Sequence, residues 1–160
     1  MTSIVLVIGG PELLPIVQPL WEMLNQHHLD HASHFQQYYE NLVFEQRQAV
    51  LLEKSRNGQL RVTLAKDVDL NRWVGYCIST ITYRGEGEID SLFILSEYRG
   101  SGTGERVMRD AVDWMNRNAV PDVKLVVAAG NEQVFPFYEK FGFFPKYTTL
   151  VQNTEPEKTD

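Results

Sequence analysis

The sequence predicts a single mixed α/β (α+β) domain with about four helices around one sheet. Short apolar or alternating runs, typical of strands, are interspersed with longer runs whose apolar residues recur at helical spacing. Their order is one strand, two helices, three strands and then helix, strand, helix, strand, which indicates a meander followed by crossover connections. The length of 160 residues suits one hydrophobic core.

Turn-forming residues separate these elements. Pro11 begins the first helix, Asn57-Gly58 ends the second, and Pro121 ends the third. Residues 153–160 are polar, so we expect a flexible tail after a domain of residues 1–152. Strands are predicted at residues 3–8, 59–65, 73–83, 88–95, 123–129 and 146–152. Helices are predicted at residues 11–24, 33–55, 102–118 and 132–140.

The charge of the chain limits the class of partner. The net charge is −6 and the isoelectric point is about 5.2. An acidic balance argues against nucleic acid or an anionic membrane as the main partner, because phosphate-rich surfaces bind clustered Lys and Arg. It is compatible with a small anionic cofactor at one local site, and it mildly favours a cationic substrate such as an amine.

Cys77 is the sole cysteine and lies in an apolar stretch. It cannot form an internal disulfide, so a reducing, cytoplasmic location is the simplest setting. A buried inert thiol is favoured over a nucleophile. The apolar run at residues 4–8 is too short for a signal-peptide core or a membrane span.

A glycine-rich turn joins the strand at residues 88–95 to the next helix. Helix N-termini offer unpaired backbone N–H groups and partial positive charge, and glycine lets a phosphate approach the backbone closely. Arginine adds a permanent positive charge with fork geometry. The segment therefore predicts an anion site. Its residues are Arg99, Gly100, Ser101, Gly102, Thr103 and Gly104.

Two better-known glycine motifs do not fit this turn. A P-loop needs Lys after its last glycine, but Glu105 and Arg106 follow Gly104. A dinucleotide fingerprint needs Gly-x-Gly-x-x-Gly after the first strand of a βαβ unit, whereas Gly-x-Gly-x-Gly follows the fourth strand here. Taken alone, the turn also allows a glycine-rich helix entry without any ligand.

A second motif follows the next strand. It consists of Asn131, Val134, Phe137, Tyr138, Gly142 and Phe143. With Arg99, Gly102 and Gly104, it resembles the two signature motifs of the GNAT superfamily of acetyltransferases. The strand at residues 89–94 is similar to the cofactor-lining strand of that family. The motifs cover residues 88–144, and residues 3–83 match the family in layout only.

The resemblance implies a mostly antiparallel sheet of six to seven strands that splays apart between strands four and five. It implies an N-acetyltransferase that moves an acetyl group from acetyl-CoA, a co-substrate, to a primary amine by direct attack in a ternary complex, without a metal. Homodimers are common in the family. Only one strand follows the last predicted helix, so a partner chain is one way to complete the sheet.

The resemblance also implies which residues bind the cofactor. Backbone amides of Gly100, Ser101, Gly102, Thr103 and Gly104, beside Arg99, would hold the pyrophosphate. Backbone groups of Leu92, Phe93 and Ile94 would pair with the pantetheine arm, and the amide of Phe93 or Ile94 would donate to the oxyanion. Asn131 would bond the arm or a nearby water, and Tyr138 would lie near the thioester sulfur.

Three side chains are candidates for proton transfer. Tyr138 is the candidate general acid for the leaving sulfur, and its alternative is a place in the core. Glu88 and Asp90 share one face of their strand, and either could take the amine proton. Glu88 could instead be a solvated turn residue. Asp90 lies deeper in an apolar strand and is therefore hydrogen-bonded or functional, with a slight preference for lining the acceptor site.

Four histidines fall within residues 27–34. A solvated loop is the default interpretation, a role beside the acceptor is the next, and a metal site formed by His27 and His31 is a minority alternative. The function could also be that of an acyl-CoA-binding sensor without turnover, or acetylation of a protein Lys or N-terminus. The identity of the acceptor is not encoded in any motif of the first half of the chain.

Overall fold

The computed structural model describes residues 2–157 and contains one five-stranded sheet in the order β1-β2-β3-β4-β5. Neighbouring strands are antiparallel except β4 and β5, which are parallel. This confirms the mixed, mostly antiparallel fold class. The strands are β1 (Ile4–Gly9), β2 (Gly58–Asp67), β3 (Arg72–Thr82), β4 (Gly87–Ile94) and β5 (Val123–Leu125).

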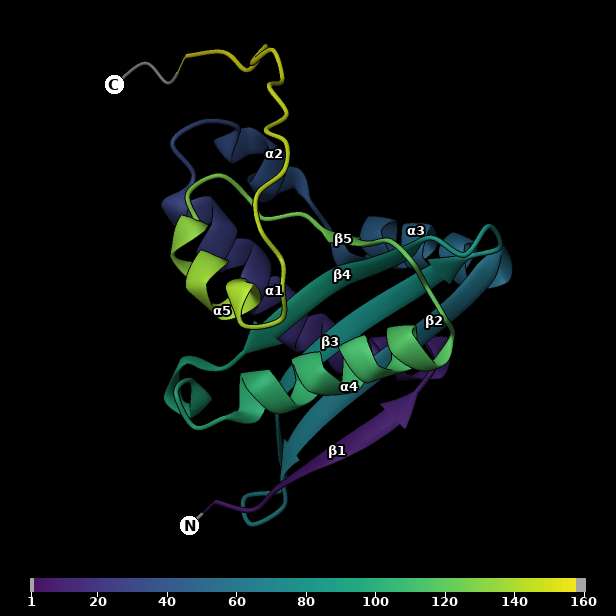
Figure 1. Cartoon of the computed structure of the whole chain (residues 1–160). Coiled ribbons are helices and arrows are strands. Elements are labelled where there is room, and N and C mark those ends of the chain that lie inside the picture. Colours follow the sequence, from purple (N-terminus) through teal and green to yellow (C-terminus); the bar gives the residue numbers. More distant parts are fainter. Residues whose placement is uncertain (1, 158–160) are drawn as a thin grey trace.

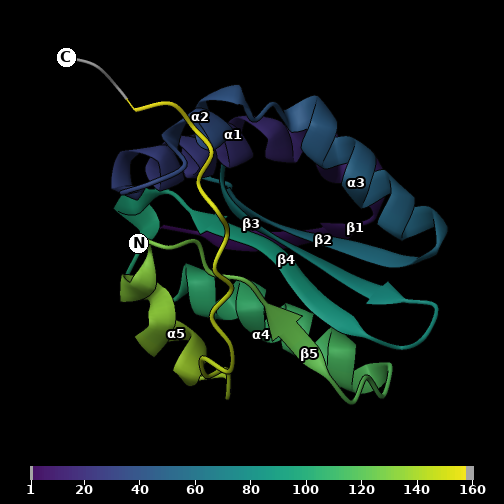
Figure 2. The same cartoon turned by 90° about the horizontal axis from the view of Figure 1, so that it is seen from above.

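Helices cover both faces of the sheet. The first three α-helices lie on one face, and the last two lie on the other (Figure 1, Figure 2). The α-helices are α1 (Leu14–His31), α2 (Gln36–Asn41), α3 (Phe44–Arg56), α4 (Thr103–Arg117) and α5 (Phe135–Glu139). Short 3-10 helices η1 (Pro11–Leu13), η2 (Ser96–Tyr98) and η3 (Glu132–Val134) precede α1, the glycine-rich turn and α5.

The core lies on both sides of the two central strands. Leu64 of β2 and Ile78 of β3 are fully buried. The helix α4 packs on the opposite side of these strands, the side that carries Thr63, with a buried stripe that includes Val107, Ala111 and Met115 at the four-residue spacing of one helix face. Fully burying a Val or Met side chain of this stripe stabilises the fold by about 1.5–3 kcal/mol. This packing fixes the start of α4, and hence the glycine-rich turn, against the sheet.

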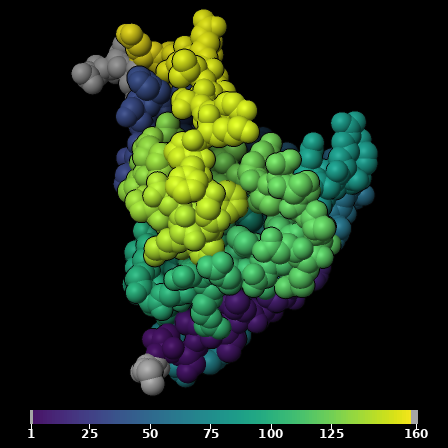
Figure 3. All heavy atoms as spheres, viewed as in Figure 1, coloured from purple at the N-terminus to yellow at the C-terminus, as the bar shows by residue number. Residues whose placement is uncertain are grey.

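The C-terminal strand predicted at residues 146–152 is wrong. Residues 140–157 contain no helix or strand, and Tyr147 and Leu150 are 83% and 91% exposed. In the space-filling view the C-terminal part of this segment projects from the body (Figure 3). The preceding strand ends early, at Leu125 rather than residue 129, and Val126 is 81% exposed. It therefore offers no long edge for pairing, and the described sheet has five strands instead of six to seven.

Two further boundaries differ from the sequence prediction. The second predicted helix is divided into α2 and α3, because Leu42 and Val43 adopt extended backbone angles. The first helix continues to His31, so His27, His28 and His31 belong to a helix instead of an irregular loop. Of the predicted tail, residues 153–157 have no helix or strand, and residues 158–160 lie outside the described residues.

Among the helices of residues 2–157, none combines the length and the apolar character that a membrane crossing requires.

Candidate active site

The strands β4 and β5 pair over a short stretch only. The parallel pairing begins at Gly87 with Val123 and ends at Ile89 with Leu125. Beyond Ile89, β4 continues along β3 to Ile94, whereas the chain after Leu125 forms no further strand. The edge of β4 from residue 90 onward is therefore open, at the position where the sequence predicted a splay between strands four and five.

A bulge in β4 lies at the same point. The register with β3 shifts between Ile78 and Ser79, and Asp90 has no partner residue. A bulge of this kind bends the strand and re-aims its side chains. The freed carbonyl oxygen of Asp90 accepts a hydrogen bond from the Arg47 guanidinium of α3 at 3.0 Å.

Backbone groups along the rest of β4 alternate between β3 and the open edge. The N–H of Leu95 donates to a carbonyl of β3 at 2.8 Å, whereas the carbonyl of Ile94 accepts from Arg99 Nε at 2.9 Å. Both polar groups of a residue in an antiparallel strand point to one side, and sides alternate along the chain. The N–H groups of Ile94 and Leu92 therefore face the open edge, and that of Phe93 faces β3.

The glycine-rich turn follows directly after this edge. Gly100 and Gly102 have φ angles of 77° and 88°, and a Cβ at either would meet no atom within 4 Å. Within residues 2–157, the backbone N–H groups of residues 100–105 donate to no protein acceptor, and the first bond of α4 runs from Arg106 N to Gly102 O at 3.0 Å. This run of free donors at the start of a fifteen-residue helix can hold an anion.

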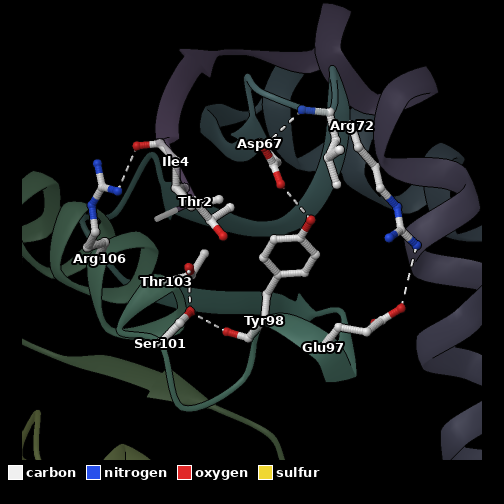
Figure 4. A pocket seen from close by; sticks show the side chains of 10 residues that line it. Thr2, Ile4, Asp67, Arg72, Glu97, Tyr98, Ser101, Thr103 and Arg106 are labelled. Carbon is white, nitrogen blue, oxygen red and sulfur yellow. Dashed lines mark hydrogen bonds and ion pairs between the residues drawn. The ribbon is translucent and has the colours of Figure 1, made fainter.

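Side chains behind the turn hold its shape. Ser101 Oγ donates to the Tyr98 carbonyl and lies 3.0 Å from the hydroxyl of buried Thr103. The Tyr98 hydroxyl donates to the Asp67 carboxylate at 2.7 Å, and this bond lowers the pKa of Asp67. These contacts tie the turn to the end of β2 (Figure 4).

A cavity of about 630 Å³ lies on this β1 side of the turn. Its two arginines are already engaged, since Arg106 donates to the Ile4 carbonyl at 2.8 Å and Arg72 lies 3.7 Å from the Glu97 carboxylate (Figure 4). The open edge of β4 faces away from β1, at the other end of the sheet order. We therefore place the candidate site at the β4 edge instead of in this cavity.

The two predicted carboxylates meet at one ammonium group. Lys54 Nζ of α3 lies 2.7 Å from Glu88 Oε2 and also contacts Asp90 Oδ1. The Asp90 side chain is fully buried, and its second oxygen accepts from the Thr80 hydroxyl at 2.6 Å. The side chains of Glu88 and Lys54 are 23% and 30% exposed. Solvent therefore reaches Glu88 and Lys54 but not Asp90.

The surroundings shift two pKa values in this cluster. Burial raises the pKa of Asp90, although its hydrogen bonds from Lys54 and Thr80 oppose the shift. Burial acts to lower the pKa of Lys54, but the bonds to Asp90 and Glu88 outweigh it, and the net shift is upward. Lys54 therefore stays cationic at neutral pH and compensates the buried carboxylate.

Tyr138 lies on α5, on the same side of the sheet as α4. Its ring packs on the core and lies 5.2 Å from the ring of Phe137. Within residues 2–157 its hydroxyl makes no hydrogen bond, and no fully buried polar side-chain atom there lacks one, so the hydroxyl is not completely buried. Burial of the residue, and then the nearby Cys77, raise its pKa. The phenol therefore holds its proton at neutral pH and can donate it.

Pro136 does not disturb the placement of Tyr138. It lies in the first turn of α5, where its missing N–H is not needed.

Asn131 precedes η3, and its Oδ1 lies 3.0 Å from His27 Nε2 of α1. The C-terminal part of the first helix is thus in direct contact with the second sequence motif.

The remaining candidates from the sequence are the cysteine and the histidines. Cys77 is fully buried, as the sequence predicted, and burial raises the pKa of its thiol to about 12, which disfavours the nucleophilic thiolate. Burial, together with His27 and His31, lowers the pKa of His28 to about 4. Among residues 2–157, no three His, Cys, Asp or Glu side chains are arranged to hold a metal ion.

Sequence reasoning missed Lys54, Thr80, Arg47 and the contact of His27 with Asn131. The first three meet Asp90 from α3 and β3, at sequence separations of 36, 10 and 43 residues. One feature of the sequence could have predicted the role of Lys54: a buried carboxylate in β4 requires a cation or a hydrogen-bond donor on the helix that covers it.

Comparison with known proteins agrees with this geometry. The model of the acetyltransferase (GNAT) family matches residues 20–143. The chain is similar to N-alpha-acetyltransferase 30 of Schizosaccharomyces pombe, with 31% identity over 80 residues, which are 48% of this chain and 53% of that protein. The match thus spans about half the length of this curated relative.

Solved structures share the fold over nearly the whole chain. A putative acetyl transferase from Pyrococcus furiosus matches with a TM-score of 0.70 and 18% identity, covering 94% of this chain and 99% of that one. An aminoglycoside N-acetyltransferase in complex with CoA matches with a TM-score of 0.65 and 12% identity, covering 98% and 97%. With the family model covering most of its length, the chain belongs to the acetyltransferase (GNAT) family.

Proposed function

We propose that the protein transfers an acetyl group from acetyl-CoA to a primary amine by direct attack within a ternary complex. One observation carries the proposal: the open edge of β4 leads directly to the free N–H groups of residues 100–105. This arrangement fits a long cofactor that has an anionic end and an amide-bearing arm. The similar aminoglycoside N-acetyltransferase was solved with CoA, which supports the same cofactor.

The residues of the turn fit a pyrophosphate. The amides of Gly100, Ser101, Gly102, Thr103 and Gly104 would hold its oxygens, since they have no protein acceptor among the described residues. The open space at Gly100 and Gly102 would be lost to any larger side chain. Arg99 braces the end of β4 and adds positive charge.

The open edge of β4 fits the pantetheine arm. Amide groups of an extended arm can pair with a strand edge as a further strand would. The outward N–H groups of Leu92 and Ile94 and the outward carbonyl of Leu92 are available, whereas the Ile94 carbonyl accepts from Arg99 and the N–H of Phe93 is turned toward β3. Of the two amides predicted as oxyanion donors, this alternation favours Ile94. A backbone donor aimed at the carbonyl oxygen stabilises the charge that develops there.

Bound acetyl-CoA supplies an acetyl thioester and a thiol leaving group. The chain must then remove a proton from the amine and return one to the sulfur. Glu88 is the proton acceptor that solvent can reach, and Asp90 holds Lys54 and the bulge in place beside it. Tyr138 donates to the departing sulfur, since its raised pKa keeps it protonated and its hydroxyl is not engaged in residues 2–157.

The acceptor is a primary amine on either a small molecule or a polypeptide. The net charge of −6 attracts cationic acceptors of both kinds. The curated relative is an N-alpha-acetyltransferase by name, which favours testing peptide N-termini beside small amines.

The test is CoA thiol release from acetyl-CoA with a panel of polyamines, amino acids, aminoglycosides and peptides. We expect release with at least one amine class, and a loss of about 10²–10⁴-fold in kcat for Tyr138→Phe. Calorimetric titration of both proteins with acetyl-CoA should give equal affinity. Binding without release by any amine would favour a sensor, and unchanged turnover in Tyr138→Phe would remove this residue from the mechanism.

A further inference from the structure

Asn131 stands at the N-cap of η3 but does not cap it. An Asn at this position commonly uses its side-chain oxygen to accept from a helix amide. Here no side-chain cap bond is formed, and the Oδ1 atom is engaged elsewhere. His27 Nε2 lies 3.0 Å from it, and Gln133 Nε2 also donates to it. The oxygen therefore has two donors that come from different elements.

This arrangement fixes the orientation of the amide group. Both lone pairs of Oδ1 are used, so the Nδ2 group is left as the part of the side chain that can meet a ligand. An amide nitrogen can only donate. Whatever Asn131 contacts in the site must hence be a hydrogen-bond acceptor, such as the carbonyl oxygen of an amide.

The contact with α1 is built into the backbone as well. Gly130 has a φ of 98°, and a Cβ at this position would lie 2.2 Å from the His31 carbonyl oxygen. The His31 ring in turn bonds the His27 carbonyl at 2.8 Å and lies tilted against the His27 ring, with the ring centroids 4.2 Å apart. The last turns of α1 thus lie in close contact with the turn before η3. The His27 side chain contacts Asn131 on one side and His31 on the other.

We propose that His27 is a positioning residue that locks the Asn131 amide with its nitrogen toward the cofactor arm. The inference rests on the proposed use of acetyl-CoA. His27 donates through Nε2–H in one neutral tautomer and as the imidazolium, so the lock does not require a change of charge. The contact between His27 and Asn131 couples α1, on the face opposite α4 and α5 (Figure 2), to the motif that begins at Asn131.

The test compares substitutions that keep or remove the donor at position 27. His27→Gln can place an amide N–H near Oδ1, whereas His27→Leu fills the space without a donor. We expect His27→Leu to weaken acetyl-CoA binding about tenfold in calorimetry, the effect of one lost bond of about 1.4 kcal/mol, with the KM of the amine unchanged. His27→Gln should restore most of the affinity. Tm values identify any variant that fails to fold.

A third variant tests the direction of the amide. Asn131→Asp keeps the acceptor for His27 and Gln133 but replaces the donating nitrogen. We expect it to bind acetyl-CoA more weakly than His27→Leu does, while its Tm stays near that of the wild type. Equal acetyl-CoA affinity in wild type, His27→Leu and Asn131→Asp would overturn the inference. Failure of the wild type to bind acetyl-CoA at all would instead overturn the proposed function.

Discussion

Lys54 Nζ lies 2.7 Å from Glu88 Oε2, and the same ammonium contacts the buried carboxylate of Asp90. One ammonium group thus forms ion pairs with two carboxylates of β4, a strand of the candidate site. Removing it would leave Asp90 in the interior with the Thr80 hydroxyl as its remaining side-chain donor.

Lys54→Met should destabilise the protein through Asp90. Breaking a buried ion pair at one partner costs about 3–5 kcal/mol, and we expect the lower end because Lys54 is 30% exposed. The measurement is urea unfolding of the variant and the wild type at pH 7. Arg56→Met is the matched control, since the Arg56 side chain is 66% exposed and pairs with Glu53 at the surface.

The loss in Lys54→Met should depend on pH. The folded-state pKa of Asp90 is raised, so its favourable contribution is complete below the ordinary pKa of an aspartate and is lost as pH rises through the folded value. Without Lys54 that folded pKa rises further. The difference in unfolding free energy from the wild type should accordingly be smaller at about pH 5 than at about pH 8. A constant difference would mean that Asp90 is not the group responsible.

Glu88 and Asp90 should differ in what their substitution affects. Glu88→Gln keeps the hydrogen bond to Lys54 but cannot take a proton, so we expect kcat to fall by about 10²-fold or more with stability changed little. Asp90→Asn should reduce stability more than Glu88→Gln does, because one buried oxygen becomes a donor facing Thr80 or Lys54. Steady-state kinetics and thermal unfolding separate the two effects. A larger loss of kcat in Asp90→Asn would assign the proton transfer to Asp90.

Two glycines offer a matched comparison for the anion site. Gly102 and Gly85 have φ angles of 88° and 84°, and a Cβ at either would meet no atom within 4 Å. Alanine at each position should cost a similar strain of about 1–3 kcal/mol. Only Gly102→Ala should weaken acetyl-CoA binding in calorimetry, because Gly85 lies in the β3–β4 turn. Equal affinities in the two variants would place the pyrophosphate elsewhere.

Tyr138 should remain a proton donor across the usual range of assay pH. Burial raises its pKa above that of a free phenol, so ionisation of Tyr138 should cause no fall in kcat up to about pH 10. The pH profiles of wild type and Tyr138→Phe should therefore have the same shape and differ in height. An alkaline decline that is present in the wild type and absent in the variant would contradict this.

The sequence predicted best where a local residue pattern determines the backbone. The turn at Gly102 and the helix that carries Tyr138 both lie where their motifs placed them along the chain. Spacing within one segment is readable because the helix period and the demands of a positive φ act locally.

Features that depend on contacts between distant segments were not predicted. The bulge at Asp90 is defined by its register with β3, and Lys54 reaches it from α3. The break between α2 and α3 at Leu42 contains no Gly or Pro, the residues that most clearly mark a helix end in a sequence. Residues 146–152 have the composition of a strand, but a strand forms only where an edge is available to pair with it.

The most direct test of this account is calorimetric titration of the wild-type protein with acetyl-CoA. The open β4 edge and the free amides of the turn predict saturable binding of one acetyl-CoA per chain, with a Kd between about 1 μM and 1 mM, the range in which enzymes commonly hold their substrates. Absence of binding at millimolar acetyl-CoA, in protein that unfolds cooperatively, would contradict the account.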